Sequence, residues 1–115
     1  MSIQRHITNH RLSEAVKANG FIFLAGQVPT NPEGDAEAQT ANVLAQIDTL
    51  LQDMGPDKSK ILEATIFLTD LGNYVGLNRA WDAWVPEGQA PARACVKADL
   101  ADPTWLVEIK LTALA

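Results

Sequence analysis

The spacing of the hydrophobic residues switches between strand and helix patterns along this chain, and this restricts its fold more than any other feature. From about residue 36 to residue 54, apolar residues recur at helical spacing. They are Val43, Leu44, Ile47, Leu50, Leu51 and Met54. Asp35 is a suitable N-cap for this helix, and Gly55-Pro56 is a strong stop signal.

A second helix is predicted over about residues 74–85, with Asp70 or Asn73 as its cap. Its buried face is expected to contain Tyr74, Leu77, Trp81 and either Trp84 or Val85.

Strand patterns occupy most of the remaining chain, and Asn19-Gly20 predicts a two-residue hairpin turn. The predicted strands are Ile3–Ile7, Leu12–Ala18, Phe21–Ala25, Ile61–Thr69, Ala92–Asp99 and Trp105–Ala113. The order β-β-β-α-β-α-β-β favours one α+β domain over residues 1–115, with a mixed sheet and both helices on one face. The other sheet face would need cover, most simply from another subunit.

Composition excludes several classes of partner. The net charge is −5, and the nine basic residues are scattered, so nucleic acid and anionic membrane surfaces are unfavourable partners. No segment approaches the roughly 20 apolar residues of a membrane-spanning helix, and residues 1–6 lack a signal-peptide pattern. The single cysteine, Cys95, excludes an intrachain disulfide. We expect a cytoplasmic protein without a cofactor or metal site.

The last two predicted strands each place a charge among apolar residues, at Arg93 and Glu108. Strand alternation puts Arg93 and Cys95 on one face of their strand, and Ala94 and Val96 on the other. Because the apolar sets suit the helix-covered face, we expect Arg93, Cys95 and Glu108 on the uncovered face. Such a face would lie where subunits meet.

These residue types suit a site that handles a small anion. Arginine offers a planar fork of donors that matches a carboxylate, and glutamate can orient a water or transfer a proton. The alternative is that Arg93 and Glu108 pair with each other across the sheet. In isolation, Cys95 reads as a small apolar filler, Asn78 as a helix-edge amide and Gly26 as a strand end. The alternative for Gly26-Gln27 is a loop that presents backbone N–H groups to a ligand.

Several motifs together resemble the Rid family, also called the YjgF/YER057c/UK114 family. They are PARACV (residues 91–96), LVEI (106–109), GQVP (26–29), QTAN (39–42), ATIFL (64–68) and NRAW (78–81). The segments AWDAW (80–84) and VEIK (107–110) are most similar to the YoaB-like branch. The resemblance implies a chorismate-mutase-like fold, a homotrimer and ligand clefts between subunits. It also implies hydrolysis of reactive enamines and 2-imino acids, such as 2-iminopropanoate, to 2-keto acids and ammonia.

The resemblance also implies roles for individual residues. Arg93 matches the carboxylate-binding arginine, Glu108 the glutamate that activates water, and Cys95 the pocket cysteine. Asn78 and Gly26 match residues that line the cleft. Leu12 stands where the characterised deaminases have a tyrosine, so the resemblance implies a more apolar pocket with one hydroxyl fewer.

Two other functions stay open. The Leu12 difference motivates a module that binds a small carboxylate or 2-keto acid without turning it over. An endoribonuclease or translation-inhibitor role, historically attached to the family, is disfavoured by the acidic charge balance.

Overall fold

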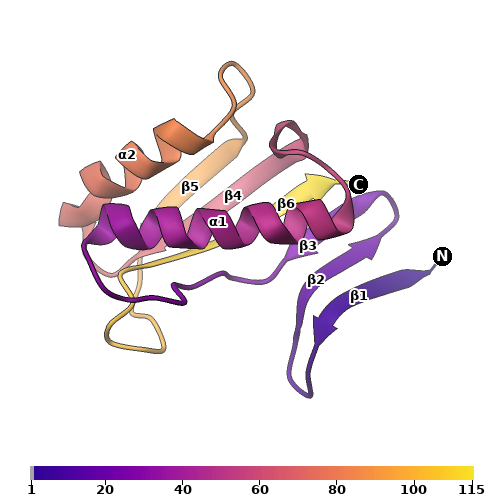
Figure 1. The fold of residues 1–115 in the computed structure, drawn as a ribbon, viewed down its shortest axis with the longest axis horizontal. Helices are drawn as coiled ribbons and strands as arrows, with labels where there is room; N and C mark the ends of the chain where they lie inside the picture. The colour runs from indigo at the N-terminus through magenta and orange to yellow at the C-terminus, as the bar shows by residue number, and fades with distance from the viewer. Residues whose placement is uncertain (1) are drawn as a thin grey trace.

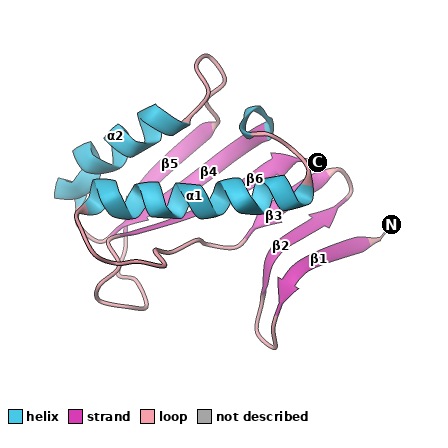
Figure 2. Cartoon of the chain, in the orientation of Figure 1, coloured by secondary structure: helices cyan, strands magenta, loops and turns pink. Residues whose placement is uncertain are grey.

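A six-stranded mixed sheet with two helices on one face forms the molecule, as the computed structural model of residues 2–115 shows (Figure 1). The strand order is β1-β2-β3-β6-β4-β5, and only the β4–β5 pair is parallel. The strands are β1 Ile3–Thr8, β2 Ser13–Ala18, β3 Phe21–Leu24, β4 Ile61–Leu68, β5 Ala92–Lys97 and β6 Val107–Leu114. The helices are α1 Ala36–Met54 and α2 Tyr74–Trp84, with short 3-10 turns at Lys58–Lys60 and Leu71–Asn73. The predicted element order and α+β class are confirmed (Figure 2).

The predicted hairpin turn and the predicted ends of α1 occur at the expected residues. Asn19 and Gly20 have φ angles of 52° and 82°, the left-handed pair that a tight hairpin turn requires. The Asp35 side chain accepts a hydrogen bond from the Ala38 N–H at the start of α1, and Gly55 ends that helix with φ 115°. Asn73 precedes α2 but makes no side-chain cap hydrogen bond.

The core lies between the helices and the sheet. The apolar stripe of α1 packs on central strands through fully buried side chains, including Ile47 of α1, Ile66 of β4 and Ile109 of β6. Burying each such side chain stabilises the fold by about 1.5–3 kcal/mol relative to exposure. From α2, Leu77 and Trp81 join the same core.

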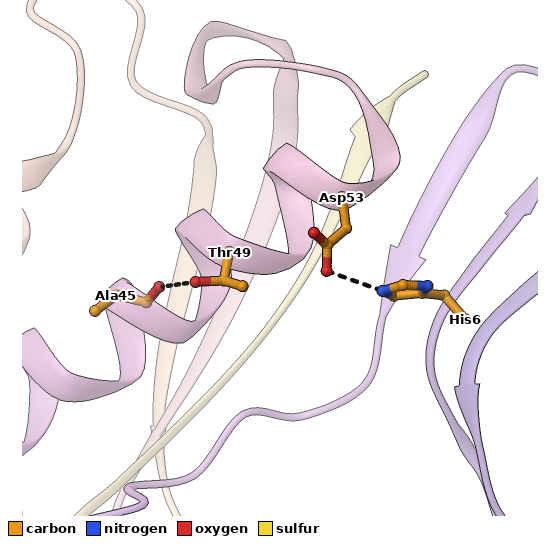
Figure 3. A network of polar contacts seen from close by, with 4 residues as sticks. All are labelled: His6, Ala45, Thr49 and Asp53. Carbon is orange, nitrogen blue, oxygen red and sulfur yellow. Dashed lines mark hydrogen bonds and ion pairs between the residues drawn. The ribbon is translucent and has the colours of Figure 1, made fainter.

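The N-terminal hairpin is tied to the end of α1. His6 of β1 lies 3.0 Å from the Asp53 carboxylate, and one turn earlier the Thr49 hydroxyl donates to the Ala45 carbonyl (Figure 3). Both ends of the His6–Asp53 contact are solvent-accessible, so we assign it about 1 kcal/mol or less. It nevertheless defines the side of the hairpin that faces the helices.

Within residues 2–115, no helix covers the opposite face of the sheet (Figure 1). It carries exposed apolar side chains from several strands, among them Phe21 and Phe23 of β3, Val96 of β5 and Leu114 of β6. An uncovered apolar sheet face of this kind suits a contact with another protein surface.

The strand register places Arg93 and Cys95 on the helix-covered face. In the parallel β4–β5 pair, Arg93 lies opposite Ala64 and Cys95 opposite Ile66. Paired residues of neighbouring strands project to the same face, and both β4 partners are buried in the core beneath the helices.

Glu108 projects from the other face, where its β4 partner is Phe67, which in turn pairs with Val96. The expectation that Arg93 and Cys95 share the uncovered face with Glu108 is therefore wrong. The cause is the position of β5 at the sheet edge: there the polar Arg93 packs on α2, while the apolar Val96 stays 43% exposed on the open face.

Candidate functional site

Arg93 lies against two aromatic side chains of α2, Tyr74 and Trp81. Its Nη2 donates a 2.9 Å hydrogen bond to the Tyr74 hydroxyl. Its guanidinium carbon lies 5.7 Å from the Tyr74 ring centroid and 5.3 Å from that of Trp81. Both distances are within the range of cation–π attraction, and none of these contacts neutralises the charge. Arg93 therefore presents an oriented cation with donors left for a ligand.

A cavity of about 410 Å³ opens beside this guanidinium, lined by Leu71, Tyr74, Arg93 and Cys95. The α2 prediction placed Tyr74 in the buried face, but it is 42% exposed. It begins the helix beside edge strand β5, so part of its ring covers Arg93 and part borders the cavity. The sequence did not predict Tyr74 as a polar partner of Arg93, because no sequence pattern relates residues 74 and 93.

Cys95 forms an apolar part of the cavity wall. Burial raises the pKa of its thiol, and the Arg93 cation partly opposes that rise. The thiol is therefore protonated at neutral pH and a poor nucleophile, since the thiolate is the reactive form.

Alkylation of Cys95 by iodoacetamide is expected to depend on pH in a way that reports this environment. Because the thiol pKa is raised, the midpoint of the rate-versus-pH curve should lie above that of the same protein in urea. Arg93→Met keeps an apolar side chain over Cys95 but removes the cation that lowers the thiol pKa. The midpoint of the alkylation curve should therefore be higher still in this variant. An Arg93→Met midpoint at or below the parent value would contradict this account.

Asn78 lies on α2 one turn beyond Tyr74 and one turn before Trp81. Helical spacing puts all three residues on one stripe, the stripe that contacts Arg93 through its two aromatic members. The structure thus brings Arg93 and Cys95 together in one cavity wall and places Asn78 on the helix surface that borders Arg93.

Gly26 and Glu108 form a second, separate group. A Cβ added at residue 26 would overlap Oε2 of Glu108 and lie 2.8 Å from its Cδ, so the carboxylate rests directly on the glycine. Gln27 fixes this approach, because its backbone exchanges hydrogen bonds of 2.7 and 3.0 Å with Ile109. The buried Gln27 side chain also donates to Glu14, a polar contact that the sequence reading missed.

A larger cavity of about 450 Å³ adjoins Gly26, between the N-terminal hairpin and α1. Glu14 and Gln27 are among the polar groups that line it. Leu12 precedes β2 in the β1–β2 loop, where its N–H donates to the Asn9 side chain, and it is 46% exposed. It therefore presents an apolar side chain to the surroundings, and its expected place in a ligand pocket stays a prediction.

The two groups do not meet within one chain. Arg93 belongs to β5 and Glu108 to β6, with β4 between them, and they project from opposite faces of the sheet. Direct pairing of Arg93 with Glu108 across the sheet, the alternative interpretation, is therefore excluded. Each group is open on its own face of the sheet.

Residues 2–115 show no metal cluster and no membrane-spanning helix. No three His, Cys, Asp or Glu side chains among them are grouped so as to hold a metal ion. Neither α1 nor α2 is long and apolar enough to cross a bilayer, and no other helix of the described chain is.

The comparisons with known proteins decide the family. The model of the Endoribonuclease L-PSP family matches residues 3–115. The chain belongs to this family. The RutC family protein YoaB of Escherichia coli K12 is 48% identical over 113 residues, which cover 98% of each chain. The resemblance to the Rid family and its YoaB-like branch is thereby confirmed.

Solved structures of family members share the fold. A YjgF family protein from Neisseria meningitidis is 55% identical, with a TM-score of 0.96 over 99% of this chain and 95% of the other. The Rid family protein YyfA from Yersinia pestis is 33% identical, with a TM-score of 0.87 over 94% of this chain and 90% of the other. The chain therefore has the chorismate-mutase-like fold of the YjgF proteins.

Proposed function

We propose that this protein hydrolyses reactive enamines and 2-imino acids, of the 2-iminopropanoate type, to 2-keto acids and ammonia. The observation that carries the proposal is the oriented guanidinium of Arg93 in a cavity wall, which has no carboxylate partner among residues 2–115. Arginine binds carboxylates bidentately, and every 2-imino acid carries a carboxylate beside the reacting carbon. Membership of the Rid family supports the same reaction class.

The complete site would be assembled between protomers. One protomer supplies Arg93, Cys95 and Asn78, and its neighbour supplies Gly26, Glu108 and Leu12. Two features support this arrangement: the halves lie on opposite faces of the sheet, and the face that carries Glu108 is apolar and uncovered. In a closed homotrimer each of three equivalent interfaces would hold one such site.

In the proposed mechanism, the protein accelerates hydrolysis mainly by orienting the substrate and a water molecule. Arg93 holds the substrate carboxylate and so places the imine carbon beside a water on Glu108. The Glu108 carboxylate takes a proton as the water oxygen bonds to that carbon. Glu108 passes this proton to the imine nitrogen, which gives a neutral carbinolamine. Glu108 then removes the carbinolamine hydroxyl proton and delivers it to the nitrogen, so the carbon–nitrogen bond breaks, the carbonyl forms and ammonia leaves. Water and imino acid thus give keto acid and ammonia, and orientation supplies much of the rate gain.

A direct test generates 2-iminopropanoate in the presence of semicarbazide and follows semicarbazone formation with and without the protein. The proposed activity predicts slower trapping, because the protein removes the imine before semicarbazide reacts with it. Calorimetry with 2-ketobutyrate runs beside this assay. Binding without an effect on trapping would overturn the hydrolase proposal in favour of a carboxylate-binding module, which the exposed Leu12 favours.

Gly26→Ala is expected to lower imine hydrolysis by about 10- to 100-fold without unfolding the protein. The new methyl group would occupy the place of the Glu108 carboxylate, which can swing away because it ends a flexible side chain. The effect should be non-additive. Adding Gly26→Ala to Glu108→Gln should cost little more than Glu108→Gln alone, whereas a full multiplicative loss would show that Gly26 acts independently of Glu108.

A further inference from the structure

We propose that Tyr74 is part of the carboxylate-binding group, both orienting Arg93 and donating its own hydroxyl proton to the ligand. This inference rests on the proposed function, since it concerns the ligand that Arg93 would hold. The geometry begins with the 2.9 Å contact from Arg93 Nη2 to the Tyr74 oxygen. A guanidinium has only donors, so the hydroxyl oxygen is the acceptor in this bond.

The hydroxyl proton of Tyr74 is then free for a second bond. A phenolic hydroxyl both donates and accepts, and here Arg93 uses an acceptor position of the oxygen. Tyr74 and Arg93 line the same cavity, so an anion there could receive donors from both side chains. A carboxylate has two oxygens and about four acceptor positions, which is enough for this pair.

The ring of Tyr74 has a separate effect. Together with Trp81 it contacts the Arg93 cation, which restricts the guanidinium to one side of the cavity. An arginine side chain on an edge strand would otherwise lose considerable rotamer freedom when it binds a ligand. Prior restraint by the two rings lowers that cost, as expected of a positioning residue.

The hydroxyl and the ring can be tested separately. Tyr74→Phe removes the hydroxyl and keeps the ring, so it should weaken 2-ketobutyrate binding by about 5- to 10-fold, as expected for one hydrogen bond of about 1–1.4 kcal/mol. Tyr74→Leu removes both and should weaken binding further. Val75→Ala changes the next residue of α2, which is 62% exposed, and serves as the matched control with unchanged affinity.

Calorimetric affinity is the main readout, because it does not depend on catalysis. For Tyr74→Phe we also expect KM for the imino acid to rise while kcat stays within about twofold, since the interaction is with the unreacting carboxylate. The uncharged amide of 2-ketobutyrate provides a second control, and its affinity should not distinguish Tyr74→Phe from the parent. A role confined to stabilising α2 would instead lower the Tm without changing the ratio of acid to amide affinity.

Failure of this inference is separable from failure of the proposed function. An unchanged 2-ketobutyrate Kd in Tyr74→Phe, with parent binding and hydrolysis both present, overturns the role of Tyr74 alone. Absence of hydrolysis in the parent, with a Kd that still weakens in Tyr74→Phe, overturns the reaction and supports the carboxylate-binding group. Absence of both 2-ketobutyrate binding and imine hydrolysis in the parent overturns both.

Discussion

Oligomers that combine Arg93→Ala and Glu108→Gln chains are expected to recover imine hydrolysis that neither variant shows alone. Each variant by itself should lose about 100-fold or more, because one lacks the carboxylate clamp and the other the proton acceptor. In a site built from two chains, an Arg93→Ala chain still supplies an intact Glu108, and a Glu108→Gln chain an intact Arg93. Their interface restores one complete site.

The fraction of activity recovered depends on how often the two kinds of chain meet at an interface. With equal amounts of two freely mixing chains, about one quarter of all interfaces pair an intact Arg93 with an intact Glu108, so about one quarter of the parent activity should return. Co-expression of the two chains in equal amounts, with purification through one tag that both carry, would give this mixture without selecting for or against mixed oligomers. Activity is then measured by semicarbazide competition.

A second mixture provides the matched control. The double variant Arg93→Ala/Glu108→Gln mixed equally with the parent should also keep about one quarter of the activity if each site needs two chains. If each site lies within one chain, that mixture keeps about one half, and the mixture of single variants stays at background. A site shared by two chains and a site within one chain are therefore distinguished by both mixtures. A site within one chain raises the activity expected of the parent mixture and abolishes that of the single-variant mixture.

Gln39→Leu is expected to lower the free energy of unfolding by about 3 kcal/mol, the largest effect on stability that we predict. Gln39 is 1% exposed and lies on α1. Its amide donates to the carbonyls of Pro32 and Thr104 at 2.7 and 3.0 Å, and its oxygen accepts from the Leu106 N–H at 2.8 Å. Leucine has a similar size but satisfies none of these groups.

Gln39→Leu should disturb the position of Glu108 as well as the packing of the core. Leu106 immediately precedes β6, so its contact with Gln39 defines where the strand that carries Glu108 begins. Chemical denaturation of Gln39→Leu and parent at one protein concentration would measure the loss, since dissociation makes oligomer stability depend on concentration. Gln52→Leu, an exposed change on the same helix, should shift stability by less than about 0.5 kcal/mol. Equal effects of the two substitutions would contradict the assigned role.

Much of the fold could be predicted because its signals are local. The helical stripe that includes Ile47, the cap at Asp35 and the turn at Asn19-Gly20 each depend on residues within a few positions of one another. Such signals act through backbone geometry and side-chain period, which are the same in any fold. The same holds for the family motifs, whose residues are close together in sequence.

The arrangement of the site could not be predicted in this way. Alternation along a strand states which residues share a face of that strand, but it does not relate the faces of two strands until their pairing is known. Here β4 lies between β5 and β6. The register of β4 with β5 places Arg93 on the helix-covered face, and its register with β6 places Glu108 on the uncovered face.

By itself, therefore, the sequence determined the elements, their order and the family, and it singled out Arg93 and Glu108 as candidate site residues. Only the tertiary structure decided that these two residues project from opposite faces of the sheet, that Tyr74 accepts a hydrogen bond from Arg93, and that Gly26 admits the Glu108 carboxylate. The physical reason is distance along the chain. Contacts between residues 74 and 93, or 26 and 108, come from strand pairing and helix packing over the whole sheet, and no local pattern records them.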